Sequence, residues 1–335
     1  MLLPWSRYMS QAIALAQLGP RSSNPQVGCV IVSGLGEVVG TGFHHGAGTP
    51  HAEIEALSDA GDLAQGSTAV VTLEPCRHVG RTGPCTEALI EAGISRVVYA
   101  QSDPTTQASG GAALLRNAGI EVVGGVLESE ACAVNRAWTH VQLSGRPYVI
   151  LKIAQTLDGR VADARGGPTA ITGQQAQALT HNLRAQCDAV MVGTATALID
   201  NPNLTVRLQG VETQPLRVIV GERELPGSLN VFDESAPTLI IQDRRPGAVL
   251  EVLGESGVQK VFLEGGPTLA GAFLGAGMVE EVVWFLAPTL FGAGPVALPA
   301  LGQLVRVDVT EVKRIGNDVM VRGRVIHDHE QGDRN

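Results

Sequence analysis

Residues 72–85 have the sequence TLEPCRHVGRTGPC, and residues 50–53, earlier in the chain, have the sequence PHAE. These two stretches supply one histidine, His51, two cysteines, Cys76 and Cys85, and the carboxylate of Glu53. One nitrogen and two thiolate ligands leave a tetrahedral zinc ion with an open position, which a catalytic site needs and a closed structural site lacks. Glu53 would then take a proton from a water at that position. The spacing therefore predicts a catalytic site with one Zn²⁺ per chain.

The position of these residues relative to the expected helices supports the prediction. Residues i and i+2 do not face each other inside a helix, so His51 and Glu53 can reach one metal only if the helix expected at Ala52–Leu63 begins at the site. Cys76 follows an expected buried strand, and Cys85 begins another expected helix. Helix N-termini favour thiolates, because their dipoles stabilise negative charge there.

Other interpretations of this region stay open on the residues alone. His78 could supply a fourth ligand and make the zinc site structural. His78 and Arg81 lie in the loop between the cysteines, where they would contact substrate, with Arg81 on a phosphate, or simply belong to a surface loop. Asn24, before the first expected strand, would place an amide on the substrate or form a turn with Pro25.

The composition is that of a globular enzyme. A chain of 335 residues is too long for one ordinary core, so two domains are expected. The net charge of −9 does not indicate the basic face of a nucleic-acid binder. No apolar run approaches the length of a membrane span, and the N-terminal residues lack the regions of a signal peptide. Five cysteines, two of them assigned to the metal, fit a reducing, cytoplasmic setting better than a disulfide framework.

Hydrophobic periodicity predicts alternating strands and helices in both halves, hence α/β domains with mainly parallel sheets and helices on both faces. In the first half, we expect strands at 27–32, 38–43, 68–73, 95–100 and 120–126, and helices at 5–18, 52–63, 85–92, 111–118 and 128–143. In the second half, we expect strands at 148–154, 188–192, 216–220, 238–241, 260–263, 281–286, 305–313 and 318–326, and helices at 173–186, 247–256 and 267–276. The predicted domains are 1–145 and 146–330, followed by a polar tail at 331–335.

Two features of the second domain point to a ligand. Lys152, one of three lysines, lies inside an apolar run, and a buried lysine needs either a ligand or an ion-pair partner. Gly265-Gly266-Pro267-Thr268 links a strand to a helix, where free backbone amides could hold a pyrophosphate; a plain tight turn is the alternative. No Gly-x-Gly-x-x-Gly follows a strand, so a Rossmann site is not indicated.

His-x-Glu followed by Pro-Cys and a second Cys is the signature of zinc deaminases. The stretches 24–28, 50–53 and 72–85 closely resemble the bifunctional riboflavin-biosynthesis deaminase/reductase family. Transfer-RNA and cytidine deaminases have two residues between the cysteines, whereas this chain has eight. The resemblance continues through residues 151–160, 188–207 and 264–270, so it spans nearly the whole chain.

The resemblance implies a cytidine-deaminase-like three-layer domain followed by a dihydrofolate-reductase-like α/β domain. It implies zinc-dependent deamination of a small phosphorylated substrate, a diamino-pyrimidinone bearing a ribosylamino 5′-phosphate, and then reduction of the ribosyl group to ribityl with NADPH. It also makes a homo-oligomer possible. The residues implied to surround the reductase substrate are Lys152, Pro168, Arg184, Asp200, Leu204, Arg207 and Glu264. Those implied to lie along the cofactor are Ala154, Ala170, Thr196, Gly266, Pro267, Thr268, Leu269, Ala270, Gly271 and Ala272.

One departure from the family pattern concerns the reductase. The family usually has Ser-x-Trp before Ile-Thr, and here Pro168 and Ala170 occupy those positions, with Thr169 as the nearest hydroxyl. A deaminase whose second domain is a non-catalytic binding or assembly module is therefore the alternative function, and NADPH binding distinguishes the two.

A nucleic-acid deaminase is a third class of function, which the acidic net charge and the long loop between the cysteines disfavour. Arg244 and Arg245 follow an expected strand and would favour a 2′-phosphate, or form a solvated surface.

Overall fold

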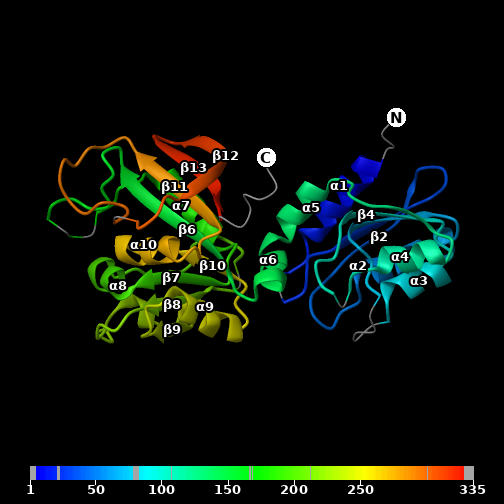
Figure 1. Ribbon diagram of the computed structural model, residues 1–335, viewed down its shortest axis with the longest axis horizontal. Helices are drawn as coiled ribbons and strands as arrows, with labels where there is room; N and C mark the ends of the chain where they lie inside the picture. The colour runs from blue at the N-terminus through cyan, green and yellow to red at the C-terminus, as the bar shows by residue number, and fades with distance from the viewer. Residues whose placement is uncertain are drawn as a thin grey trace. The chain divides into compact units, whose positions relative to one another are not determined.

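The computed structural model describes residues 5–20, 23–77, 83–106, 108–165, 167, 169–211, 213–299 and 301–327 (Figure 1). The chain divides into two compact units, residues 1–145 and 146–335. Each unit contains its own sheet and its own hydrophobic core. Among the described residues, none of the helices has the length and apolar character that crossing a bilayer requires.

The first unit is built on a five-stranded sheet in the order β2–β1–β3–β4–β5. Its strands are β1 (Gly28–Val32), β2 (Val38–Phe43), β3 (Thr68–Leu73), β4 (Arg96–Gln101) and β5 (Glu121–Val123). β3, β4 and β5 run parallel, but β1 pairs antiparallel with both β2 and β3. The expectation of a mainly parallel sheet is wrong here, because β1 pairs antiparallel not only with β2, across a hairpin turn, but also with β3.

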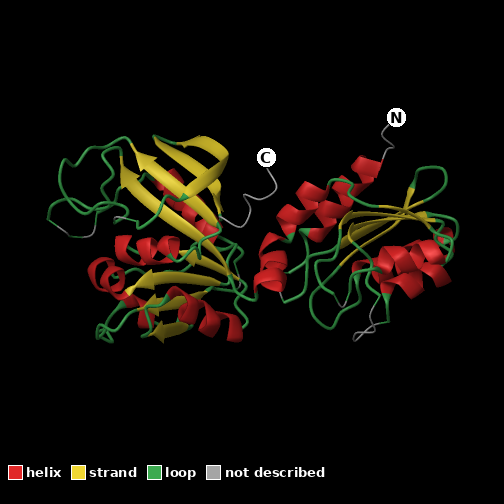
Figure 2. Ribbon diagram, in the orientation of Figure 1, coloured by secondary structure: helices red, strands yellow, loops and turns green. Residues whose placement is uncertain are grey.

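Helices cover both faces of this sheet, as expected (Figure 2). They are α1 (Trp5–Ala16), α2 (Ala52–Ala60), α3 (Cys85–Glu91), α4 (Gly111–Asn117), α5 (Glu128–Val134) and α6 (Arg136–Ser144), with a 3₁₀ turn at Gly61–Ala64. β1 alternates between the faces: Val30 and Val32 pack toward α1, and Cys29 and Ile31 pack toward α2. The single helix expected at 128–143 is two helices, because the buried Asn135 side chain bonds the backbone of Gln26 at the junction.

The second unit contains an eight-stranded sheet in the order β12–β13–β11–β6–β10–β7–β8–β9. Its strands are β6 (Tyr148–Thr156), β7 (Ala189–Gly193), β8 (Leu216–Val220), β9 (Thr238–Ile241), β10 (Lys260–Leu263), β11 (Glu281–Ala287), β12 (Arg306–Ile315) and β13 (Asp318–Ile326). The strands from β11 to β9 are parallel, and β13 and β12 add antiparallel at one edge. In such sheets ligands bind outside the carboxyl ends of the parallel strands.

The helices of this unit are α7 (Gln174–Arg184), α8 (Thr194–Asp200), α9 (Pro246–Glu255) and α10 (Pro267–Gly275), with a 3₁₀ turn at Asn230–Phe232. We did not expect α8, which follows β7 directly and ends at Asn201 in the left-handed region (φ 40°). Its polar and β-branched first turn carries no apolar periodicity. Side chains of α9 and α10 fill the main core, among them Leu250 and Phe273, both essentially buried.

Candidate active sites

The first unit brings one histidine and two cysteines together. Nδ1 of His51 lies 3.1 Å from Sγ of Cys85 and 3.6 Å from Sγ of Cys76. The ligand atoms of all three residues lie within 4.8 Å of one another, the only such group of three metal-binding side chains among the described residues. One imidazole nitrogen and two sulfurs form the donor set of a catalytic zinc site. The residues therefore fit the ion, with a fourth position free of a protein ligand in the described part of the chain.

Helix starts position these ligands. His51 is the residue before α2, in an extended conformation, and Cys85 is the first residue of α3. The backbone N–H of Cys85 also donates to Sγ of Cys76, at 3.5 Å. Hydrogen bonding from Cys85 is the main cause that lowers the pKa of Cys76 to about 4. A lowered pKa favours the thiolate form of Cys76, which is the form that binds a metal.

Glu53 lies in the first turn of α2 and is buried, at 4% exposure. Its carboxylate interacts with the side chains of Cys76 and Cys85. Burial is the main cause that raises the pKa of Glu53. The helix therefore begins at the site, and a carboxyl group that is shielded from bulk water lies next to the ligand set.

A second histidine, which the sequence analysis did not single out, lies beside this site. His44 follows β2 directly and is buried, and its ring meets that of His51 edge-on, with centroids 5.4 Å apart. Nε2 of His44 lies 2.9 Å from the side-chain nitrogen of Asn24, and Nδ1 lies 3.0 Å from the carbonyl oxygen of Pro50. His44 therefore connects Asn24, a predicted substrate residue, to the segment that carries His51.

Glu74 holds the backbone of a segment that lies next to the same site. Its buried carboxylate accepts hydrogen bonds from the backbone N–H groups of Asp103 (3.3 Å), Gly110 (3.1 Å) and Ala112 (2.9 Å). Between those positions, Ala108 packs in one buried cluster with Cys76 and Cys85. Glu74 stands two residues before a ligand, yet no periodicity or spacing marks it, because its partners are backbone groups distant in the sequence.

The second unit contains a cavity of about 1200 Å³ along the carboxyl ends of its parallel strands. Lys152 and Ala154 line it from β6, Glu264 follows β10, and Asp200 ends α8. The remaining lining includes Thr169, Ala170, Thr194, Thr196, Gly221, Glu222, Arg223, Arg244, Gly265, Gly266, Pro267, Thr268, Leu269 and Ala272. The cavity thus extends from the charged side chains near β6 and β10 to a second set of charged side chains beyond β8, which are Glu222, Arg223 and Arg244.

A buried ion cluster lies at the first end of this cavity. Arg184 binds both carboxylate oxygens of Glu264, and Nζ of Lys152 lies 3.9 Å from Oε2 of the same carboxylate. Burial opposes ionisation of Glu264, but Arg184 and Lys152 together hold its pKa below the usual value. Burial lowers the pKa of Lys152 and raises that of Asp200. The cluster can offer both positive and negative groups to a ligand.

The start of α10 forms the cavity's middle. Gly266 precedes the helix, and Pro267 is its first residue. A Cβ on Gly266 would lie 3.1 Å from Oγ1 of Thr196, so glycine lets this backbone lie against Thr196 without crowding. Helix N-termini present free N–H groups to anions, so size and lining both fit a dinucleotide with its pyrophosphate here.

Comparison with known proteins decides the family. Residues 5–101 match the cytidine and deoxycytidylate deaminase zinc-binding region, and residues 147–321 match the RibD C-terminal domain. The chain is 43% identical over 312 residues to the riboflavin biosynthesis protein RibD of Mycobacterium tuberculosis, covering 90% of this chain and 91% of the relative. The chain belongs to the bifunctional RibD deaminase/reductase family.

Other RibD proteins agree over the same length. RibD of Escherichia coli is 39% identical over 356 residues, with 93% of this chain and 97% of the relative covered. The structure of RibD from Acinetobacter baumannii (form 1) has a TM-score of 0.86 and 36% identity, covering 96% and 99% of the two chains. A Thermotoga maritima structure, described as a diaminohydroxyphosphoribosylaminopyrimidine deaminase/5-amino-6-(5-phosphoribosylamino)uracil reductase, has a TM-score of 0.87 and 34% identity, covering 96% and 98%.

Membership of the RibD family confirms the expected fold class and function. The fold is a cytidine-deaminase zinc domain followed by a dihydrofolate-reductase-like RibD reductase domain. This RibD-family chain is a bifunctional enzyme of riboflavin biosynthesis, a zinc deaminase and a pyrimidine reductase that acts on small pyrimidine substrates.

The structure brings most of the predicted reductase residues of this RibD-family chain to the cavity, but not all. Three of the predicted substrate residues that the structure describes do not line the cavity. Arg184 binds Glu264, which lines it, whereas Leu204 is buried and Arg207 is exposed, with its guanidinium hydrogen-bonded to His181. Ala270 lies in the core, and Gly271 packs against the ring of Pro299. Thr169 lines the cavity, with its hydroxyl bonded to the carbonyl of Gly167. His78, Arg81, Pro168 and the tail at 331–335 lie outside the described residues.

Proposed function

We propose that residues 1–145 deaminate a diamino-pyrimidinone carrying a ribosylamino 5′-phosphate, and that residues 146–330 then reduce the ribosyl group of the product to ribityl with NADPH. The observation that carries this proposal is that His51, Cys76, Cys85 and Glu53 meet in one unit, while the other unit holds the large cavity. The described activities of the similar Thermotoga maritima protein support both substrates.

In the proposed deaminase, His51, Cys76 and Cys85 hold the zinc ion. When bound, zinc would lower the pKa of a water molecule and so supply a nucleophile at neutral pH. Glu53 accepts the proton of that water and returns a proton to the departing amine, which leaves as ammonia. The segment around Ala108 covers the cysteines and helps to exclude bulk water.

Three further residues are proposed to hold the deaminase substrate. Asn24, fixed by His44, presents its amide to the polar edge of the pyrimidine. His78 and Arg81, in the loop between the two cysteines, contact the rest of the substrate, with Arg81 on its phosphate because a guanidinium can bind phosphate with two parallel hydrogen bonds.

The ligand assignment predicts what a single cysteine change does. Cys76→Ser is expected to lose most of its bound zinc, because a thiolate ligand is replaced by a weak hydroxyl ligand. Deaminase activity should fall together with the zinc content. Elemental analysis of the purified variant measures the zinc content. Cys132→Ser, which changes a half-buried thiol outside the site, is the matched control. Full zinc occupancy in Cys76→Ser would refute the assignment.

In the proposed reductase, the start of α10 holds the cofactor pyrophosphate, and Ala154, Ala170, Thr196 and residues 266–272 lie along the cofactor. When bound, NADPH supplies a hydride to the ribosyl C1′. Lys152, Asp200 and Glu264 orient the substrate at the cavity end where they line it. Pro168, Arg184, Leu204 and Arg207 complete the proposed substrate set.

The other end of the cavity is proposed to select NADPH over NADH. Arg223 and Arg244 line it beyond β8, where Arg244 pairs with Glu222 at 3.2 Å. Arg245 does not line the cavity, and its guanidinium binds Asp243. Since the substrate end lies at β6 and β10, the adenosine half of the cofactor falls here, and a 2′-phosphate would meet Arg244.

The two adjacent arginines therefore make a controlled test. Arg244→Ala is expected to raise the dissociation constant for NADP⁺ about 3- to 10-fold and to leave that for NAD⁺ unchanged, because one exposed charge-assisted contact is lost. Arg245→Ala should change neither value. Calorimetric titration gives both constants. Equal weakening for NADP⁺ and NAD⁺ in Arg244→Ala would refute 2′-phosphate recognition.

One observation favours a second candidate, a deaminase whose second unit binds but does not reduce. Ala170 lines the cavity where the family usually has a large aromatic ring. Calorimetric titration with NADPH, followed by addition of the deaminated ribosylamino-pyrimidine phosphate, discriminates: NADPH binding followed by its oxidation supports the reductase, and binding without oxidation supports the alternative.

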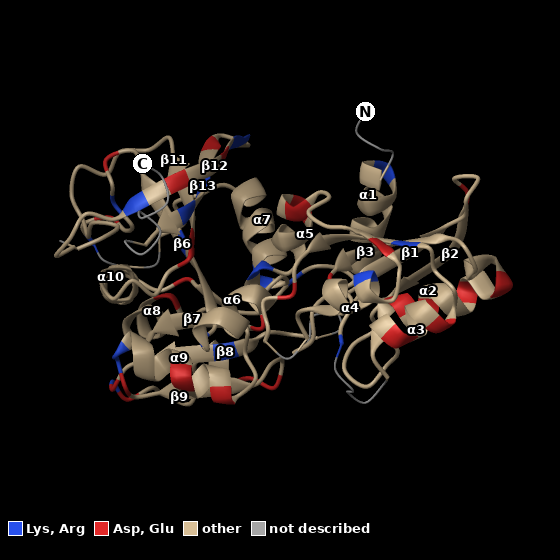
Figure 3. Ribbon diagram, turned by 45° about the vertical axis from the view of Figure 1, so that its right-hand side comes forward, with Lys and Arg blue, Asp and Glu red and all other residues tan. Residues whose placement is uncertain are grey.

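A polynucleotide substrate is disfavoured by the helices that carry the zinc site. α2 and α3 contain no Lys or Arg and present Glu55, Asp59, Glu87 and Glu91, visible as acidic bands in Figure 3. A phosphate backbone would meet repulsion along these two helices.

A further inference from the structure

Residues 201–207 follow Asp200 and begin the connection between α8 and β8. Two of them have left-handed backbones, Asn201 (φ 40°) and Leu204 (φ 54°). A non-glycine residue in this region is costly and persists only where its surroundings hold it. The segment belongs to no helix or strand, so it depends on side chains from elsewhere.

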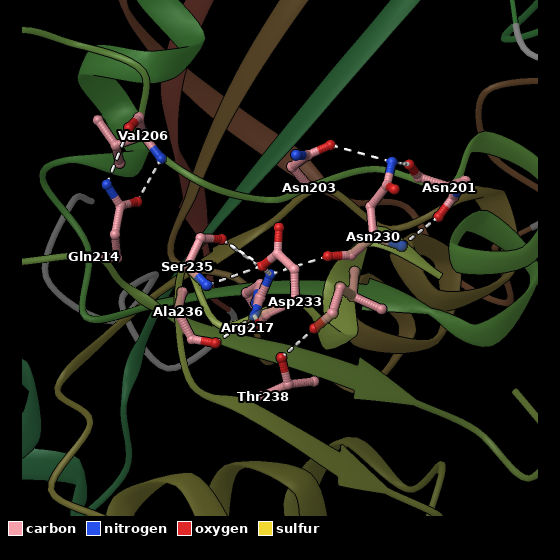
Figure 4. A network of polar contacts seen from close by, with 11 residues as sticks. Asn201, Asn203, Val206, Gln214, Arg217, Asn230, Asp233, Ser235, Ala236 and Thr238 are labelled. Carbon is pink, nitrogen blue, oxygen red and sulfur yellow. Dashed lines mark hydrogen bonds and ion pairs between the residues drawn. The ribbon is translucent and has the colours of Figure 1, made fainter. Parts of the chain in front are cut away.

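Asn230 holds the first part of this segment (Figure 4). Its backbone N–H donates to Oδ1 of Asn201 at 2.7 Å, and its side-chain amide donates to the carbonyl of Asn201 at 2.8 Å. The same amide lies 3.3 Å from Oδ1 of Asn203. One exposed residue thus fixes the left-handed turn that directly follows Asp200.

Asn230 is itself held by a buried arginine. Arg217 of β8 is fully buried, and its guanidinium donates to the carbonyls of Asn230, Asp233 and Ala236 and to the carboxylate of Asp233 (Figure 4). Hydrogen bonds from Ser235 and then Arg217 lower the pKa of Asp233 to about 2. The segment 230–236 is therefore fixed to the sheet.

Gln214 holds the second part of the segment. Its Oε1 accepts the N–H of Val206 at 2.7 Å, and its Nε2 donates to the carbonyl of Val206 at 3.0 Å. Arg184, which binds Glu264 at the cavity, also donates to the neighbouring carbonyl of Thr205 at 2.9 Å. The segment is thus connected on one side to the cavity's ion cluster and on the other to Gln214.

We propose that Asn230 and Gln214 are positioning residues of the reductase, which act on substrate through the segment 201–207 by fixing the backbone next to Asp200, Leu204 and Arg207. This inference rests on the proposed function, because it takes that segment as part of the substrate site. Neither residue lines the cavity or belongs to the proposed substrate set, so each is assigned a role through the segment 201–207 and not through substrate contact.

The test uses Asn230→Ala and Gln214→Ala in the full chain. Each is expected to raise the KM for the deaminated ribosylamino-pyrimidine phosphate about 3- to 10-fold with kcat changed less than twofold, as loss of one or two hydrogen bonds that orient a binding segment predicts. Ammonia release by the first unit is an internal measure of active chain and should not change. The dissociation constant for NADPH should not change either.

Thr238→Val is the matched control. Thr238 donates to the carbonyl of Val231 within the same network, and Figure 4 draws no hydrogen bond from it to residues 201–207. Its KM should equal that of the unchanged chain. Unchanged KM in both alanine variants, or an equal rise in Thr238→Val, would overturn the positioning role. If the unchanged chain does not oxidise NADPH, the proposed function fails and this inference with it.

Discussion

Glu53→Gln is expected to lower the kcat of deamination by about 10²- to 10⁴-fold, the usual contribution of a general acid–base. Glutamine keeps the shape of the side chain in its buried place but can neither accept nor return the proton. Zinc content should stay near one per chain, because Glu53 is not a proposed ligand. Ammonia release at saturating substrate and elemental analysis measure the two quantities on one preparation.

Glu55→Gln is the matched control for this prediction. Glu55 lies on the same helix, accepts the N–H of Phe43 at 3.2 Å and pairs with His45 at 3.2 Å, outside the ligand set. Its replacement also turns a carboxylate of α2 into an amide and should leave kcat within about twofold, because Glu55 is not among the residues proposed to bind zinc or move the proton. Near-normal turnover in Glu53→Gln would refute the proton-transfer role.

Glu264→Gln is expected to have the second large effect, on both reduction and stability. The change leaves Arg184 and Lys152 buried without their shared anion, and breaking a buried pair in this way costs about 3–5 kcal/mol. The urea concentration at the unfolding midpoint of the second unit should fall, and the rate of NADPH oxidation should be strongly reduced. Circular dichroism and NADPH absorbance measure these changes.

The pH dependence gives an independent signature of the same cluster. The pKa of Glu264 lies below its usual value, so its contribution to stability is present above the ordinary carboxyl pKa and is lost as pH falls through the lowered one. Glu264→Gln should lack this acid-dependent loss. Glu251→Gln, an exposed change on α9, should retain it. Equal stability of Glu264→Gln and the unchanged chain at neutral pH would contradict the account.

Features set by local pattern were predictable from the sequence. The spacing of His51 and Glu53 requires a helix start, and α2 begins there. Strands with apolar, β-branched runs, such as Thr68–Leu73 and Leu216–Val220, have the expected bounds. The zinc ligand set follows from short motifs alone, because a metal site needs particular residue types at particular spacings.

Features set by long-range contacts were not predictable. Gln214 and Asn230 bond backbone groups of segments elsewhere in the chain, and no periodicity or motif marks such a side chain. The break at Asn135 depends on its contact with Gln26, more than a hundred residues away. The antiparallel pairing of β1 with β3 likewise depends on how strands assemble, which alternation along the chain does not specify.

A coupled assay tests whether one chain performs two successive reactions. Zinc-loaded protein is mixed with the diamino-pyrimidinone ribosylamino phosphate and NADPH, and ammonia and NADPH absorbance are followed together. We expect ammonia to appear first and NADPH then to be consumed. Ammonia release without any NADPH consumption would show that the chain is a deaminase alone.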